Sequence, residues 1–167
     1  MQFFCYHRDR CGSTPLRGEL TEEHWSYMDR FELIARGPTF LDDDTLTGSV
    51  HVVELPDVAA ARAFVFDEPG YQAGAYRDVL LRRTAWQSLD ASVAGGYLGI
   101  GFLDRPAPYD GLAVPRTGLA GFGPLLSDDG ALLLGAAALA VTEAAAREAL
   151  ASLPVVEAHR WERGGRR

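Results

Sequence analysis

Lysine is missing from this chain of 167 residues, and all 16 of its basic side chains are arginine. Schiff-base catalysis, which needs a lysine amine, is therefore excluded. The basic residues are outnumbered by 23 acidic ones, which gives a formal net charge of −7. Because nucleic-acid-binding surfaces need basic stripes that neutralise phosphate, this balance argues against a nucleic-acid partner.

Long apolar runs and cysteine pairs are also scarce. No stretch of eighteen apolar residues occurs in the sequence, so we expect no membrane-spanning helix and no membrane partner. The first residues lack the basic and apolar zones of a secretion signal, and we expect a soluble, cytoplasmic protein. The two cysteines, Cys5 and Cys11, form no CxxC pair and are interpreted as reduced thiols.

Motifs for metals and cofactors are weak. His7, His24 and His51 have neither HxH nor HxxxH spacing, so the sequence predicts no metal site. The glycine-rich segment at 95–99 precedes an expected strand rather than a helix, which is not the context of a nucleotide-binding loop. We therefore expect no cofactor.

An internal duplication is the main positive signal. Five short matches recur in the same order in the two halves of the chain, which is the pattern of a repeated structural unit. The matches pair Asp9-Arg10 with Asp104-Arg105, Gly37-Pro38 with Gly123-Pro124, the acidic turn 42–44 with 127–130, 59–62 with 144–147, and Trp86 with Trp161.

The spacing between matches changes at two places. The offset falls from 95 to 86 before the second Gly-Pro and from 85 to 75 after the alanine-rich helix. In the first copy, the segments lost from the second contain His24 and residues 67–76. Surface trimming explains the losses too, but both fall on segments that carry candidate site residues. We interpret the second copy as having lost its site.

The pattern of apolar, turn and capping residues predicts a βαββαβ order in each copy. In the first copy we expect strands at 2–8, 33–40, 48–55 and 77–86, a helix that starts at Leu20 with Thr21 as its cap, and a helix at 58–66 capped by Asp57. In the second we expect strands at 97–103, 118–124, 131–141 and 155–162, a helix at 143–152, and an irregular stretch in place of the first helix.

The predicted fold class is α+β, with two tandem ferredoxin-like units. Two such small units cannot each bury much surface alone, so we expect them to pack sheet to sheet as a single-chain pseudo-dimer of the dimeric α/β-barrel kind. The expected domains are 1–86, a linker at 87–96, a degenerate second copy at 97–163 and a tail at 164–167. The chain is then a monomer or a homodimer of such pseudo-dimers.

The first copy resembles the YCII family of small, dimeric ferredoxin-like proteins. The resemblance rests on an aromatic N-terminal strand, on His24 early in a helix, on Gly37-Pro38 after a strand, and on the segment 67–76 (DEPGYQAGAY). It covers roughly residues 1–86, with 97–163 as a degenerate copy. It implies a His–carboxylate pair that lines a pocket and, in at least one relative, dehydrochlorination of a chlorinated hydroquinone.

Carried over by position, the resemblance implies His24 as the catalytic histidine and Glu68 as the acid, where the family usually has aspartate. The neighbouring Asp67 is an alternative acid. An imidazole beside a carboxylate is a simple device for proton transfer near neutral pH. The structural alternative is that His24 is half-exposed and forms its hydrogen bonds with Glu23 or with solvent. Candidate substrate contacts are Tyr71, Trp25, Arg36 and Phe4.

The sequence thus predicts a cofactor-independent enzyme that performs elimination or isomerisation on a small oxygenated or aromatic substrate. One alternative is a non-catalytic module that binds a small molecule or a partner in the same pocket. A second is a cofactor-free monooxygenase of the dimeric α/β-barrel type. No residue identifies the substrate.

Overall fold

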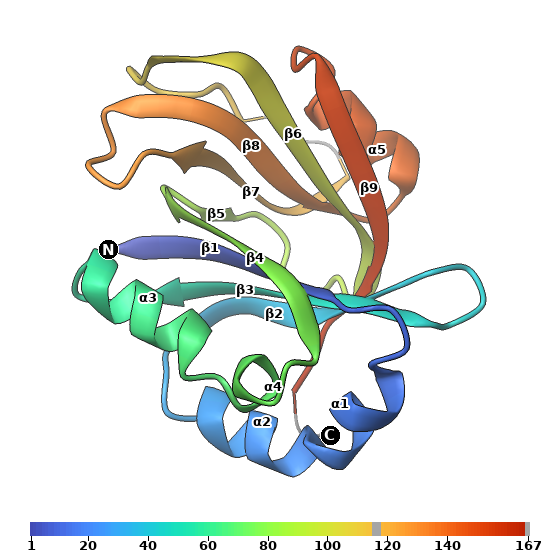
Figure 1. Ribbon diagram of the computed structural model, residues 1–167. Helices are drawn as coiled ribbons and strands as arrows, with labels where there is room; N and C mark the ends of the chain where they lie inside the picture. Colours follow the sequence, from blue (N-terminus) through green and yellow to red (C-terminus); the bar gives the residue numbers. More distant parts are fainter. Residues whose placement is uncertain (115–117, 166–167) are drawn as a thin grey trace. The chain divides into compact units, whose positions relative to one another are not determined.

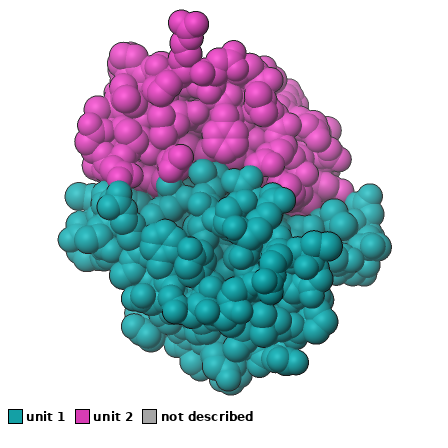
Figure 2. Space-filling view, in the orientation of Figure 1, with its two compact units in different colours: residues 1–81, 164–167 teal, residues 82–163 magenta. Residues whose placement is uncertain are grey.

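The computed structural model describes residues 1–114 and 118–165 and divides the chain into two compact units. Unit 1 comprises residues 1–81 together with 164–167, and unit 2 comprises residues 82–163 (Figure 2). No helix among the described residues is long and apolar enough to cross a membrane. Cys5 and Cys11 are free thiols, the first buried and the second exposed.

Unit 1 is an antiparallel sheet with helices on one face (Figure 1). The strands lie in the order β4-β1-β3-β2, and β3 pairs antiparallel with both β1 and β2. The elements are β1 (Gln2–Asp9), α1 (Thr14–Glu19), α2 (Thr21–Met28), β2 (Leu33–Phe40), β3 (Leu46–Glu54), α3 (Val58–Phe66), α4 (Pro69–Gln72) and β4 (Tyr76–Thr84), whose last residues belong to unit 2.

Alternation along β1 decides which side chains meet the helices. Phe3 and Cys5 pack with Met28 of α2 and Phe64 of α3 in a core of fully buried residues. His7 follows the same alternation and faces the helices. Phe4 is buried on the opposite face of the strand, away from this core.

The two longer helices of unit 1 begin differently. Asp57 caps α3 as expected, because its carboxylate accepts a hydrogen bond of 2.8 Å from the Ala60 amide. The expectation that Thr21 caps α2 is wrong, since the N-cap is Leu20. A short helix, α1, ends immediately before α2, and the Thr21 hydroxyl donates back to the Arg17 carbonyl at 3.1 Å.

Unit 2 repeats the strand order without the first helix. Its sheet runs β9-β6-β8-β7-β5, with antiparallel pairing throughout. The described residues between β6 and β7 form no helix, and residues 115–117 of the expected irregular stretch lie outside the described residues. The elements are β5 (Gln87–Ser88), β6 (Gly95–Pro108), β7 (Leu119–Leu126), β8 (Leu132–Ala140), α5 (Glu143–Ala149) and β9 (Val155–Glu162).

Small residues set the packing in unit 2. Helix α5 begins at Thr142, whose hydroxyl accepts a hydrogen bond of 3.1 Å from the Ala145 amide. Ala146 of α5 packs in a core with alanines of β8. Gly99 of β6 leaves room for the helix, because a Cβ at this position would lie 2.9 Å from Leu150.

Candidate active site

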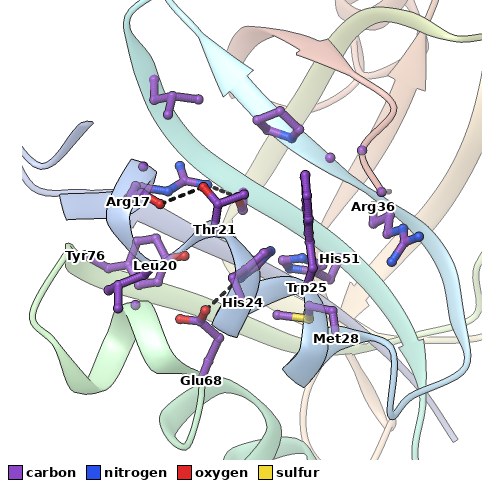
Figure 3. Close-up of a pocket in the computed structure, with 18 of the residues that line it drawn as sticks. Arg17, Leu20, Thr21, His24, Trp25, Met28, Arg36, His51, Glu68 and Tyr76 are labelled. Atoms are coloured by element: carbon purple, nitrogen blue, oxygen red, sulfur yellow. Dashed lines mark hydrogen bonds and ion pairs between the residues drawn. The ribbon is translucent and has the colours of Figure 1, made fainter. Parts of the chain in front are cut away.

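A cavity of about 280 Å³ lies in unit 1 (Figure 3). Helices α1 and α2 form one side, β2 and β3 form another, and Glu68, Gly70 and Tyr76 close it. Gly164 and Gly165, which follow unit 2 in the sequence, also line it, and the Gly164 amide donates to the Arg36 carbonyl at 3.0 Å. No sequence motif indicates this contribution from the tail.

His24 and Glu68 meet at this cavity. The Nδ1 atom of His24 lies 2.7 Å from Oε1 of Glu68. The Glu68 side chain is fully buried, and 20% of the His24 side chain is exposed. Positions 24 and 68 are brought together because α2 and the short helix α4 cover the same face of the sheet (Figure 1).

Glu68 is held at both carboxylate oxygens. It is the N-cap of α4, and its Oε2 accepts a hydrogen bond of 2.8 Å from the Tyr71 amide. Gly70 permits this close turn, because a Cβ there would lie 3.0 Å from Oε2. Pro69 at the start of α4 fixes the backbone in a helical conformation. The backbone of α4 therefore positions the Glu68 carboxylate independently of its contact with the imidazole.

The surroundings keep Glu68 ionised. Burial raises the pKa of its carboxyl group, but the hydrogen bond from His24 and the electrostatic interactions with His24 and His7 outweigh burial and lower the pKa. Burial raises the pKa of the neighbouring Tyr76 hydroxyl, and a hydrogen bond to Glu68 adds to that shift. The site therefore combines a carboxylate with a protonated phenol.

Of the two candidate acids, the structure brings Glu68 and not Asp67 to the imidazole. Asp67 is exposed at the C-terminal end of α3 and does not line the cavity. Glu68 contacts His24 with one carboxylate oxygen while it caps α4 with the other.

The candidate substrate contacts divide into two groups. Trp25 and Arg36 line the cavity, and Arg36 lies 3.5 Å from Asp29. Tyr71 does not line it, because its ring packs on Phe66 with centroids 5.0 Å apart. The expectation for Phe4 is also wrong in geometry, since its ring is fully buried on the other face of β1.

A buried ion pair forms one end of the cavity. Nη1 of Arg17 lies 2.9 Å from Asp9, and Nη2 donates to the Ser49 hydroxyl at 2.6 Å. The Arg17 guanidinium also lies 5.6 Å from the centre of the Tyr76 ring. The sequence indicates neither Asp9 nor Ser49 as a site residue, because Asp9 stands out only as part of a repeat match and Ser49 belongs to no motif.

From the sequence, His51 is a candidate only for a metal ligand, yet it lines the cavity beside His24. The two ring centroids are 5.7 Å apart, and His7 lies 6.0 Å beyond His51. Among the described residues, no three histidine, cysteine or acidic side chains form a group that suits a metal ion. An alternating strand pattern cannot distinguish a core histidine from one at a pocket, so the signal was ambiguous.

The geometry suits proton transfer at Nε2 of His24. A buried carboxylate fixed at Nδ1 selects the tautomer with the proton on Nδ1, which leaves the lone pair on Nε2. The same carboxylate stabilises the imidazolium that forms when Nε2 takes a proton. Leu20, Trp25 and Met28 add apolar surface to the cavity.

Three comparisons with solved structures are informative to different degrees. A 5-chloro-2-hydroxyhydroquinone dehydrochlorinase from Burkholderia phenoliruptrix AC1100, in complex with 2,5-dihydroxybenzoquinone, is 28% identical, with a TM-score of 0.47. That match covers 50% of this chain and 92% of the other. No curated protein matches the sequence.

Two further structures match nearly the whole chain. A putative monooxygenase from Lactobacillus acidophilus NCFM is 7% identical over 97% of this chain and 93% of its own, with a TM-score of 0.50. An anthrone oxidase-like protein is 10% identical over 98% and 90%, also with a TM-score of 0.50. At such low identities the two structural matches bear on the fold alone. They confirm the expected α+β fold of the dimeric α/β-barrel type.

The model of the YCII-related domain matches residues 1–85. That span contains β1 through β4 and both members of the His24–Glu68 pair. This chain belongs to the family of proteins with a YCII-related domain.

Proposed function

We propose that this protein is a cofactor-independent enzyme that catalyses elimination or isomerisation by proton transfer through His24 and Glu68. The observation that carries the proposal is the 2.7 Å contact between His24 Nδ1 and a fully buried carboxylate at the edge of a cavity. A fixed His–carboxylate pair beside a pocket is an arrangement suited to general acid–base catalysis.

His24 acts as the base and Glu68 as its positioning residue. Nε2 takes a proton from the substrate, and the electron pair of the broken bond moves into the substrate. In an elimination, this pair forms a double bond and a leaving group departs with its own bonding pair. In an isomerisation, His24 returns the proton to another atom. The lowered pKa of Glu68 keeps it ionised, so the proton stays on the imidazole.

The cavity limits the substrate to a small molecule. An apolar cavity of about 150 Å³ already accommodates benzene, so about 280 Å³ suits one ring with a few substituents. Leu20, Trp25 and Met28 offer surfaces for the ring. The Arg36 side chain, which is 31% exposed, is placed to contact an oxygen or an anionic substituent.

The test compares the wild-type protein with His24→Gln and Glu68→Gln, using 5-chloro-2-hydroxyhydroquinone and measuring chloride release under exclusion of oxygen. We expect kcat to fall by at least about 100-fold in both variants, with KM nearly unchanged in Glu68→Gln, because that residue touches the imidazole and not the substrate. Asp67→Asn is the matched control: it removes the adjacent, exposed carboxylate, and we expect wild-type turnover.

Other outcomes assign the pocket differently. Wild-type turnover in His24→Gln contradicts the proposal. A compound that is recovered unaltered, with affinity that depends on His24, would assign a binding module. Oxygen consumption on admission of air, with an oxygenated product, would assign a monooxygenase.

A further inference from the structure

His51 is a buried imidazole that the proposed mechanism does not use. It lies in the middle of β3, between Cys5 of β1 and Arg36 of β2 in the strand register. Only 2% of the His51 surface is exposed. The residue lines the cavity next to His24 (Figure 3). The cavity therefore offers both imidazoles to one occupant.

The hydrogen bonds of the folded chain do not account for His51. Its Nδ1 atom is buried and has no hydrogen-bond partner among the described residues. A buried polar atom left without a partner costs about 1–3 kcal/mol. The edge of the ring packs on Phe64, with centroids 6.0 Å apart, so an apolar ring would suit this side better. The fold alone gives no reason for a histidine here.

The charge state of His51 fits a hydrogen-bond donor rather than a second base. Burial lowers its pKa well below the ordinary value, and the electrostatic interactions with His24, His7, Arg17 and Arg36 lower it further. A neutral imidazole retains one N–H group and can donate it.

Proton removal by His24 requires such a donor. The electron pair left on the substrate collects on an oxygen, and stabilising that charge is a large part of catalysis in such reactions. Two other polar groups of the cavity are committed: Arg17 binds Asp9 and Ser49, and the Tyr76 hydroxyl interacts with Glu68.

We infer that His51 is a second catalytic residue, which donates its N–H to a substrate oxygen that gains negative charge as His24 removes a proton. The substrate class is then a small ring with two conjugated oxygens, one of them facing His51. The proton moves from a C–H or O–H group to His24 Nε2, and the electron pair moves through the conjugated system to the second oxygen. Nothing is oxidised in this step, and the inference rests on the proposed function.

Binding of cyclohexane-1,3-dione tests the inference. The enol form of this probe carries a hydroxyl and a carbonyl oxygen in conjugation, so it can reach both imidazoles, whereas phenol has one oxygen. We expect His51→Phe to weaken dione binding about tenfold in titration calorimetry and phenol binding less than twofold. His51→Gln, which retains an N–H donor, should recover most of the dione affinity.

Thermal unfolding separates this role from a structural one. His51→Phe removes an unpaired buried nitrogen and fills the same space with carbon, so we expect a melting temperature equal to or above that of the wild type. A lower melting temperature with an unchanged ratio of dione to phenol affinity would overturn the inference. The proposed function would survive that result if His24→Gln still abolished turnover.

The wild-type protein offers an independent measurement should His51→Phe fail to fold. With ¹⁵N-labelled histidine, the dione is expected to shift the ring-nitrogen resonances of both His24 and His51. A shift confined to His24 would overturn the role of His51 and leave the role of His24 intact.

Discussion

His7 shows how a single buried side chain links stability to pH. It is completely buried, and its Nε2–H donates to the Val65 carbonyl at 3.1 Å. Burial lowers its pKa from 6.5 to about 4, although the bond to Val65 opposes the shift. The unfolded chain therefore binds a proton at this residue in a range where the folded chain does not.

The free energy of unfolding is accordingly expected to be highest above pH 6.5 and to fall as the pH drops towards 4. The contribution of His7 amounts to about 3 kcal/mol by pH 4. His7→Phe cannot take up the proton, so its stability should fall less over the same range, although it starts lower at pH 7 because the Val65 carbonyl loses its donor. Urea unfolding at pH 7 and pH 4.5 measures the two slopes, and parallel slopes would refute the assignment.

Residues of the site differ in how far the sequence predicts them. Four of the predicted site residues line the cavity, as the sequence predicts: His24, Glu68, Trp25 and Arg36. Tyr71 and Phe4 do not, for two separate reasons. Tyr71 lies in a four-residue helix, where its ring packs on Phe66 and its amide donates a hydrogen bond to Glu68. The face of β1 that meets the helices belongs to the odd-numbered residues, which leaves Phe4 on the other side.

Helix caps provide a comparison between elements of the two units. Asp57 and Thr142 both accept hydrogen bonds from the amide three residues on. We expect Asp57→Ala and Thr142→Ala each to lower the free energy of unfolding by about 1 kcal/mol. Thr21→Ala is the control, because its hydroxyl binds the Arg17 carbonyl instead, and its effect should stay within about 0.5 kcal/mol. Denaturant titrations decide, and an equal loss in Thr21→Ala would contradict the cap assignment.

Strands and the alanine-rich helices follow from the sequence because alternation and caps are local signals. The short helices α1 and α4 do not. Helix α1 contains Pro15 and Gly18 and buries no residue, so no apolar periodicity marks it. Helix α4 has four residues, and its cap is the same carboxylate that binds His24. Both helices exist through contacts with distant segments, which a local pattern cannot report.

The duplication that the sequence predicts implies an asymmetry of the whole molecule. Three of the four histidines fall in the first 51 residues, and the fourth, His159, lies on β9 of unit 2. In the predicted second copy, the spacing between matches shortens at the two segments that hold His24 and Glu68 in unit 1. The strands and the alanine-rich helix recur, whereas the segments that carry the candidate dyad do not.

One molecule of cyclohexane-1,3-dione is therefore expected to bind per chain. Titration calorimetry gives the stoichiometry directly, and the double variant His24→Gln/Glu68→Gln should weaken binding at that single site, because the dione loses its contact with the His24 imidazole. A second equivalent that binds with comparable affinity, and persists in the double variant, would mean that the second copy has kept a site of its own.

The Glu68 carboxylate binds the His24 imidazole through one oxygen and the Tyr71 backbone amide through the other. The Tyr71 N–H is consequently an isotopic reporter for the candidate site: its exchange with solvent deuterium depends on the carboxylate that holds His24. A ligand that binds the His24 imidazole and shifts the Glu68 carboxylate should therefore change the exchange rate of the Tyr71 amide, which binds the other carboxylate oxygen. Occupancy can thus be read without any label on the ligand.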